Sequence, residues 1–133
     1  MSTINSSDAA RGNGAKVIVV DDHELFRRGL IGLLEERGIE IIGEAALAAD
    51  AIRQAADVGP CVVLMDLSMP GIDGFGAISA IVTANARPRV VVLSGSADPG
   101  DIEKARASGA FGYLMKDRIA DELVPGVLAA AAG

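Results

Sequence analysis

Five polar side chains directly follow short apolar runs in this sequence, and their types suit chemistry on phosphorus. They comprise three carboxylates, one hydroxyl and one ammonium group: Asp21, Asp22, Asp66, Ser94 and Lys116. If the apolar runs are parallel strands of one sheet, these groups meet at a single edge, because the carboxyl ends of parallel strands lie together. We therefore expect all five to contribute to one site.

Three carboxylates gathered at one edge repel one another unless a cation binds between them. Two like charges about 4 Å apart cost about 4 kcal/mol at an effective dielectric constant near 20. Oxygen ligands select a hard ion, and few protein ligands with room for water and phosphate favour Mg²⁺ over Ca²⁺. The chain has one His and one Cys, which exclude a His or Cys zinc cluster. We predict a Mg²⁺ site that includes Asp21 and Asp22.

A carboxylate beside Mg²⁺ can act as a nucleophile and accept a phosphoryl group. Asp66 is the best acceptor candidate because it ends a central strand, with the acidic pair on the neighbouring strand. The metal and Lys116 would neutralise charge on the transferring group, and the Ser94 hydroxyl would donate a hydrogen bond to one of its oxygens.

The elements that must position these groups alternate regularly along the chain. Apolar or β-branched runs predict strands, and apolar residues at helical spacing predict helices. The strands are expected at 16–20, 39–44, 61–65, 89–93 and 111–115, and the helices at 24–37, 46–58, 74–84, 98–108 and 120–132. Such alternation predicts a doubly wound α/β fold with a five-stranded parallel sheet and five helices. The second run mixes apolar with acidic residues, as an edge strand does, which favours the flavodoxin-like strand order 2-1-3-4-5.

Four segments resemble the signatures of bacterial two-component response-regulator receiver domains: VIVVDDHELFRRGL, LMDLSMPGIDG, VVVLSGS and GYLMKD. The resemblance extends from Lys16 to the C-terminus and is greatest to receivers of the LuxR/FixJ-type transcriptional regulators. It implies that Asp66 is phosphorylated by a sensor histidine kinase. It further implies that Asp22 binds Mg²⁺ directly, Asp21 largely through water, and Ser68 through its backbone carbonyl.

The same resemblance implies a switch. Lys116 would bind the phosphate, Ser94 would be the switch hydroxyl, and Tyr113 would be the switch aromatic. The acyl phosphate would shift the population toward an active surface on the fourth helix, fifth strand and fifth helix. That surface would control a C-terminal DNA-binding output domain outside this chain, and the resemblance leaves open a phosphorylation-dependent homodimer.

Three segments depart from the pattern of the family. Asp117 stands where many receivers have a proline after the lysine, joined by a cis peptide. Pro99 and Gly100 stand at the start of the fourth helix, where we expect them to shorten or loosen it. Pro125 lies in the fifth helical segment and is expected to kink the helix unless it falls in the first turn.

Composition limits the classes of function. The chain has 133 residues with a net charge of −6, which excludes direct nucleic-acid binding as its main activity. No apolar run approaches the roughly 18 residues that span a bilayer, and no export signal is visible, so we expect a cytoplasmic protein without membrane contact. Residues 1–14 are expected to form a disordered leader and residues 15–133 the receiver domain. His23 is interpreted as a helix-start residue without a chemical role, and Cys61 as a small core residue.

Two alternatives stay open beside the phosphoacceptor reading, in which the domain catalyses only its own phosphorylation and dephosphorylation. The first is a receiver-like interaction domain that never needs phosphate. The second is an aspartate-based phosphohydrolase of the haloacid-dehalogenase type. That class carries its nucleophile in a D-x-D motif after the first strand, whereas this chain has Asp21, Asp22 and His23 there and an isolated acid after the third.

Overall fold

A computed structural model of the chain describes residues 14–68 and 73–133. Within these residues, five parallel strands form one sheet in the order β2-β1-β3-β4-β5. The strands are β1 (Lys16–Val20), β2 (Glu40–Ala45), β3 (Cys61–Asp66), β4 (Pro88–Ser94) and β5 (Gly112–Met115). The predicted strand order is confirmed. Thirteen of the fourteen residues assigned to a leader lie outside the described ranges.

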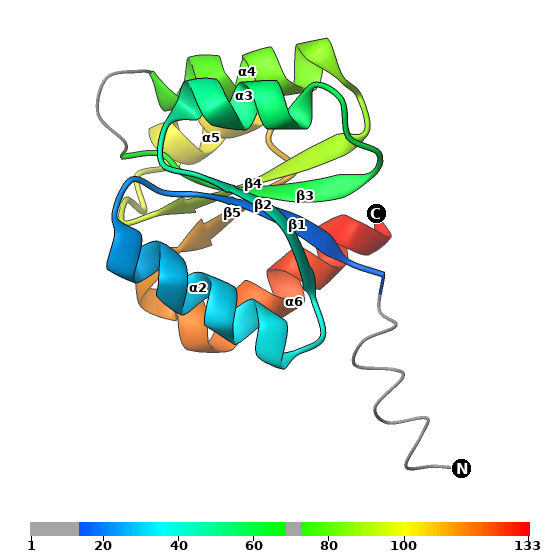
Figure 1. Ribbon diagram of the computed structural model, residues 1–133. Coiled ribbons are helices and arrows are strands. Elements are labelled where there is room, and N and C mark those ends of the chain that lie inside the picture. The colour runs from blue at the N-terminus through cyan, green and yellow to red at the C-terminus, as the bar shows by residue number, and fades with distance from the viewer. Residues whose placement is uncertain (1–13, 69–72) are drawn as a thin grey trace.

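Helices cover both faces of the sheet. They are α2 (Glu24–Glu36), α3 (Ala48–Ala55), α4 (Gly74–Ala84), α5 (Pro99–Ala107) and α6 (Ile119–Ala132), with a short 3₁₀ turn, η1 (Lys116–Arg118), before α6. Helices α2 and α6 pack on one face, and α3, α4 and α5 pack on the other (Figure 1). This arrangement confirms the doubly wound fold. None of the helices in the described ranges is long and apolar enough to cross a membrane.

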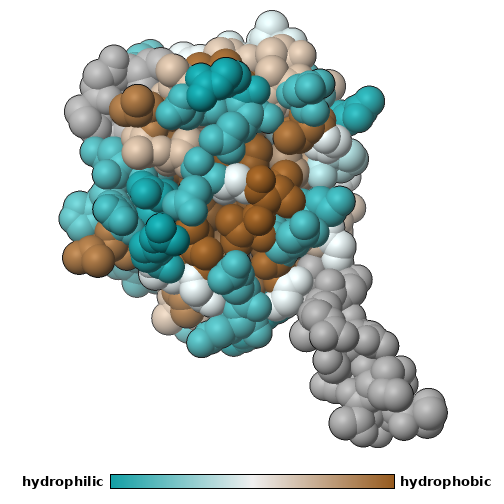
Figure 2. Space-filling view, viewed as in Figure 1, coloured by the Kyte–Doolittle hydropathy of each residue, from teal (hydrophilic) through white to brown (hydrophobic). Residues whose placement is uncertain are grey.

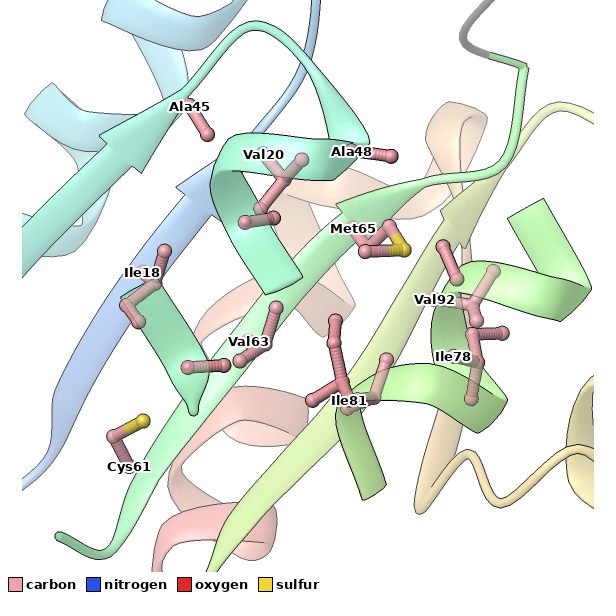
Figure 3. Close-up of a cluster of buried hydrophobic side chains, with 14 of the residues drawn as sticks. Ile18, Val20, Ala45, Ala48, Cys61, Val63, Met65, Ile78, Ile81 and Val92 are labelled. Carbon is pink, nitrogen blue, oxygen red and sulfur yellow. The ribbon is translucent and has the colours of Figure 1, made fainter. Parts of the chain in front are cut away.

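Alternate strand residues build two separate cores. Ile18, Val63 and Val92 point toward α3 and α4, where they meet Ile78 and Ile81 (Figure 3). The residues between them face α2 and α6, so that Val19, Leu64 and Leu93 pack with Leu34 and Leu123. Strand β3 is buried at all six positions because it has both strand neighbours and helices on both faces. Its first residue, Cys61, is a core residue as interpreted, with 6% of its surface exposed.

Strand β2 forms one edge of the sheet, as its mixed pattern predicts. Its register with β1 shifts: Val17 pairs with Ile41 but Ile18 pairs with Gly43, so Ile42 is an extra residue in the ladder. Such a bulge disrupts the regular edge that another strand would need for pairing. Ile42 is partly exposed, and apolar surface gathers near the middle of this face of the molecule (Figure 2).

The three departures from the family pattern have different outcomes. Pro99 and Gly100 begin α5, which ends one residue inside each expected bound, and Asp98 caps the helix by accepting a 2.9 Å hydrogen bond from the Gly100 N–H. Whether they loosen the helix stays a prediction. Pro99 takes the first helical position, where a missing N–H costs nothing. Pro125 lies in the interior of α6 rather than in its first turn. No peptide bond within the described ranges is cis, so Lys116 and Asp117 are joined by a trans peptide.

Candidate functional site

The carboxyl ends of β1 and β3 bring three acidic side chains together. Oxygen atoms of Asp21, Asp22 and Asp66 all lie within 4.8 Å of one another. Asp21 and Asp66 are buried, with 1% and 4% of their surfaces exposed, whereas Asp22 is exposed to solvent. Strand pairing causes this convergence, because β1 and β3 are parallel neighbours that end at the same edge.

Asp66 is surrounded by hydrogen-bond donors. Its Oδ1 accepts hydrogen bonds from the Ser68 N–H at 2.9 Å and the Ser68 hydroxyl at 2.8 Å. Its Oδ2 accepts a hydrogen bond from Lys116 Nζ at 3.1 Å. Burial acts to raise the pKa of Asp66, but these hydrogen bonds and the lysine charge outweigh it and hold the pKa below its ordinary value. Asp66 is therefore an ionised carboxylate held close to an ammonium group.

Asp21 has the opposite balance. Burial raises the pKa of its carboxyl and the nearby Asp66 charge adds to the rise, against the hydrogen bond from the His23 N–H and the attraction of Lys116. Its Oδ1 accepts the His23 N–H at 2.8 Å, but its buried Oδ2 has no hydrogen-bond partner among the described residues. A buried carboxylate oxygen without a donor is costly. This oxygen therefore fits a cation ligand.

Lys116 reaches this site from the end of β5. Besides its bond to Asp66, its ammonium group lies 5.1 Å from the centroid of the Phe26 ring on α2. The lysine thus connects β5, β3 and α2 across the edge of the sheet. Because the ring face attracts a cation, Phe26 helps to hold the ammonium group in place.

Ser94 and Tyr113 belong to a hydrogen-bonded loop beside the acidic cluster. The buried Ser94 hydroxyl accepts the Ser96 N–H at 3.0 Å, and the Tyr113 hydroxyl donates to the Ser96 carbonyl at 2.9 Å. The Ser96 hydroxyl in turn donates to Asp101 on α5 at 2.7 Å. Ser96 thus links Ser94, Tyr113 and α5, a connection that the sequence interpretation does not include.

The turn between β1 and α2 is held by contacts of His23 and Arg27. His23 is the N-cap of α2, where its Nδ1 accepts the Phe26 N–H at 3.4 Å, which agrees with its interpretation as a helix-start residue. Arg27 donates to the Asp21 carbonyl and to Glu44, and it gives no sequence signal beyond being a basic residue in the first turns of a helix. For Ser68, the observed contacts use the N–H and hydroxyl, and its carbonyl role stays a prediction.

The fold and the site together define a flavodoxin-like α/β domain with an acidic edge and an opposed lysine. The response regulator receiver domain family matches residues 17–127. The transcriptional regulatory protein LiaR of Bacillus subtilis is 37% identical over 119 residues, which are 89% of this chain and 56% of LiaR. The chain thus spans about half the length of this curated relative.

Solved structures agree with this match. A two-component response regulator of the LuxR family from an Aurantimonas species has a TM-score of 0.84 and 34% identity, covering 90% of this chain and 86% of that one. A Burkholderia pseudomallei response regulator, crystallised with a phosphorylated aspartic acid, a calcium ion and citrate, has a TM-score of 0.74 and 27% identity over 88% of this chain and 66% of its own. This chain therefore belongs to the receiver domain family of two-component response regulators, and the expected similarity to LuxR-type regulators is confirmed.

Proposed function

We propose that this receiver domain accepts a phosphoryl group on Asp66 from a sensor histidine kinase. The observation that carries the proposal is the state of Asp66: a buried, ionised carboxylate that contacts Lys116 and lies within 4.8 Å of two further acids. A carboxylate with these neighbours is a nucleophile in a place where positive charge can neutralise an incoming phosphoryl group.

The transfer follows from the chemistry of the two residues. An oxygen of Asp66 attacks phosphorus, the bond from phosphorus to the donor histidine nitrogen breaks, and that nitrogen keeps the electron pair. The product is an acyl phosphate on Asp66, with Lys116 paired to a phosphoryl oxygen and the Ser94 hydroxyl donating to another. Later attack by water releases phosphate and restores the carboxylate, so the domain catalyses only its own phosphorylation and dephosphorylation.

The donor set fits Mg²⁺. Asp21 supplies a buried oxygen without a donor, and Asp22 and Asp66 supply oxygens close to it. Small hard cations prefer such oxygen ligands and keep several waters. When bound, Mg²⁺ would neutralise charge on the phosphoryl group, with Asp22 as a direct ligand, Asp21 acting largely through water and the Ser68 carbonyl as a further ligand.

The surroundings of the domain are part of the same proposal. In this view a phosphorylation-dependent change on α5, β5 and α6 controls a C-terminal DNA-binding output domain. LiaR has room for such a domain, since the match covers 56% of its length. Phosphorylation could also act through a homodimer of receivers. We place the domain in the cytoplasm, away from the membrane. This domain itself does not bind nucleic acid.

Intact-mass spectrometry after treatment with acetyl phosphate tests the proposal. We expect the wild-type chain to gain one phosphoryl group in Mg²⁺ and none in a chelator, and Asp66→Asn to gain none because an amide is not a nucleophile. Asp57→Asn is a matched control, since Asp57 is an exposed acid in the loop before β3, at the opposite end of the sheet. Full labelling of Asp66→Asn would contradict the assignment. An unlabelled wild type would favour the phosphorylation-independent alternative.

A further inference from the structure

The side chain of Arg27 connects the turn after β1 to the edge strand β2. Its Nη1 donates a 2.7 Å hydrogen bond to the backbone carbonyl of Asp21, and its Nε donates a 2.8 Å hydrogen bond to Glu44 Oε1. The side chain is largely buried, with 12% of its surface exposed. A planar guanidinium can hold two acceptors at once in a fixed geometry, which an ammonium group cannot do.

This contact completes the anchoring of Asp21. The Asp21 N–H donates to the Ala45 carbonyl at 3.0 Å, its carbonyl accepts from Arg27, and its Oδ1 accepts from the His23 N–H. Among the hydrogen-bonding groups of Asp21, the buried Oδ2 alone has no partner among the described residues. The backbone of Asp21 is therefore held on both sides, by the Ala45 carbonyl and by Arg27.

Anchoring is needed because the cluster repels itself. Oxygen atoms of Asp21, Asp22 and Asp66 lie within 4.8 Å of one another, and Asp21 and Asp66 are buried, so charge repulsion and lost hydration both favour a turn that moves Asp21 outward. Hydrogen bonds to charged groups are the stronger class in proteins, and Arg27 makes two of them between β2 and this turn. Glu44 fixes the guanidinium, and the guanidinium fixes the Asp21 carbonyl.

We propose that Arg27, fixed by Glu44, is a positioning residue that holds the turn after β1 so that Asp21 and Asp22 bind a divalent cation with Asp66. The inference rests on the proposed function, because it requires a Mg²⁺ site at these acids. It adds a residue on α2 and a residue on the edge strand to the apparatus of the site.

Charge and position predict opposite effects, which makes the inference testable. If Arg27 acted only through its positive charge, removing that charge would strengthen the binding of a cation to the neighbouring acids. If Arg27 acts by holding the turn, removing it weakens cation binding although the site becomes more negative. Mutation of residues that hydrogen-bond to metal ligands and orient them typically changes the affinity for the metal by about 10–100-fold.

Isothermal titration of the purified chain with MgCl₂ measures this effect. We expect Arg27→Gln to raise the Kd for Mg²⁺ about tenfold or more. Arg28→Gln is the matched control: it removes the same charge from the next residue, which is 62% exposed and reaches Glu44 only at 3.9 Å. The control should leave the Kd unchanged or slightly lower.

A second variant tests whether the two residues act together. Glu44→Ala, which removes the acceptor of the Arg27 hydrogen bond, should raise the Kd in the same direction. Arg27→Gln with Glu44→Ala should raise it no further than Arg27→Gln alone, because the contact is already lost. Additive effects in the double variant would show independent roles and overturn the inference. If Arg27→Gln does not fold, an unchanged Kd in Glu44→Ala overturns the inference on its own.

The outcomes separate this inference from the proposed function. A wild-type chain that binds Mg²⁺, with binding lost in Asp22→Asn but unchanged in Arg27→Gln, overturns the positioning role and leaves the proposed site standing. Equal weakening by Arg27→Gln and Arg28→Gln also overturns it, because it shows an effect that does not depend on the contacts of Arg27 with Asp21 and Glu44. A wild-type chain that binds no Mg²⁺ overturns both. Unfolding free energies of all variants, measured in urea without metal, show whether a Kd change merely follows lost stability.

Discussion

At the scale of single residues, the two buried acids are held in opposite ways. Asp66 accepts three hydrogen bonds, including one from an ammonium group, so its charge is compensated. Asp21 carries a buried oxygen with no donor among the described residues, and its pKa is raised by burial. A group left in this state destabilises the fold and is retained where its function requires it.

Replacing Asp21 by Asn should therefore stabilise the chain in the absence of metal. The amide can still accept the His23 N–H, and it removes a desolvated charge beside Asp66. We expect the free energy of unfolding to rise by about 1–3 kcal/mol at neutral pH. Urea denaturation measures the change, and Asp57→Asn, at an exposed position, should stay within about 0.5 kcal/mol of wild type.

The same variant has a definite pH dependence. Because the pKa of Asp21 is higher in the folded chain than in the unfolded chain, the ionised carboxylate destabilises the fold fully above its folded pKa. That destabilisation disappears as the pH falls toward and below the ordinary value of 3.8. The advantage of Asp21→Asn should therefore be full above the folded pKa of Asp21 and vanish in acid. A gain in unfolding free energy that does not depend on pH would show that the charge of Asp21 is not what destabilises the wild-type chain.

The residues that end the strands were predictable, and their partners were not. A carboxylate or lysine after an apolar run is visible in the sequence, and the parallel sheet then brings Asp21, Asp66 and Lys116 together. The Ser68 hydroxyl contact with Asp66 depends on the turn after β3. The Arg27 contact depends on which face of α2 meets Glu44 on β2. These are relations between segments far apart in the chain, which periodicity does not report.

At the scale of elements, the two prolines in helices have opposite effects on stability. Pro99 occupies the first position of α5, after the Asp98 cap. Pro125 lies inside α6, where it has no N–H to donate to the carbonyl one turn earlier. Both are exposed, so their effects on the backbone outweigh any packing of their rings.

Substitution of each proline by alanine should separate these effects. Proline in a helix interior costs about 3 kcal/mol relative to alanine, but it also restricts the unfolded chain by about 0.4–1 kcal/mol. Pro125→Ala should thus stabilise the chain by about 1–2 kcal/mol. Pro99→Ala should destabilise it by up to about 1 kcal/mol, because it loses only the restriction. Denaturation midpoints shifted in the same direction by both variants would contradict this account.

Element boundaries show where sequence patterns lose information. The buried strands were placed within a residue at each end because charged residues or turns bound their apolar runs. Helix α3 covers Ala48–Ala55 rather than the expected 46–58, since its alanine-rich sequence continues past both ends and its N-cap makes no side-chain hydrogen bond. The bulge at Ile42 could not be predicted, because it is a property of the pairing between β1 and β2.

At the scale of the whole molecule, Lys116 and Ser96 connect the acidic cluster to the surface formed by β5 and α5. Lys116 links Asp66 to the end of β5, the strand that carries Tyr113. Ser96 contacts Ser94 at the end of β4 and Tyr113 on β5, and its bond to Asp101 connects both to α5. A phosphoryl group on Asp66 would compete for Lys116 and Ser94 at the same time. Both connections would then report its arrival to β5 and α5.

Loss of Lys116 should therefore uncouple the site from that face. In Lys116→Ala, beryllofluoride with Mg²⁺, a mimic of the phosphoryl group, should still shift the backbone amide signals of Asp66 and Ser68. The shifts at Tyr113 and along α5 should be much smaller than in wild type, because no ammonium group pulls the end of β5 toward the phosphoryl oxygens. Lys16 is an exposed lysine that begins β1, at the end of the sheet away from the acidic cluster, so Lys16→Ala should respond as wild type does. Full shifts at Tyr113 and α5 in Lys116→Ala would show that the signal travels through Ser94 and Ser96 alone.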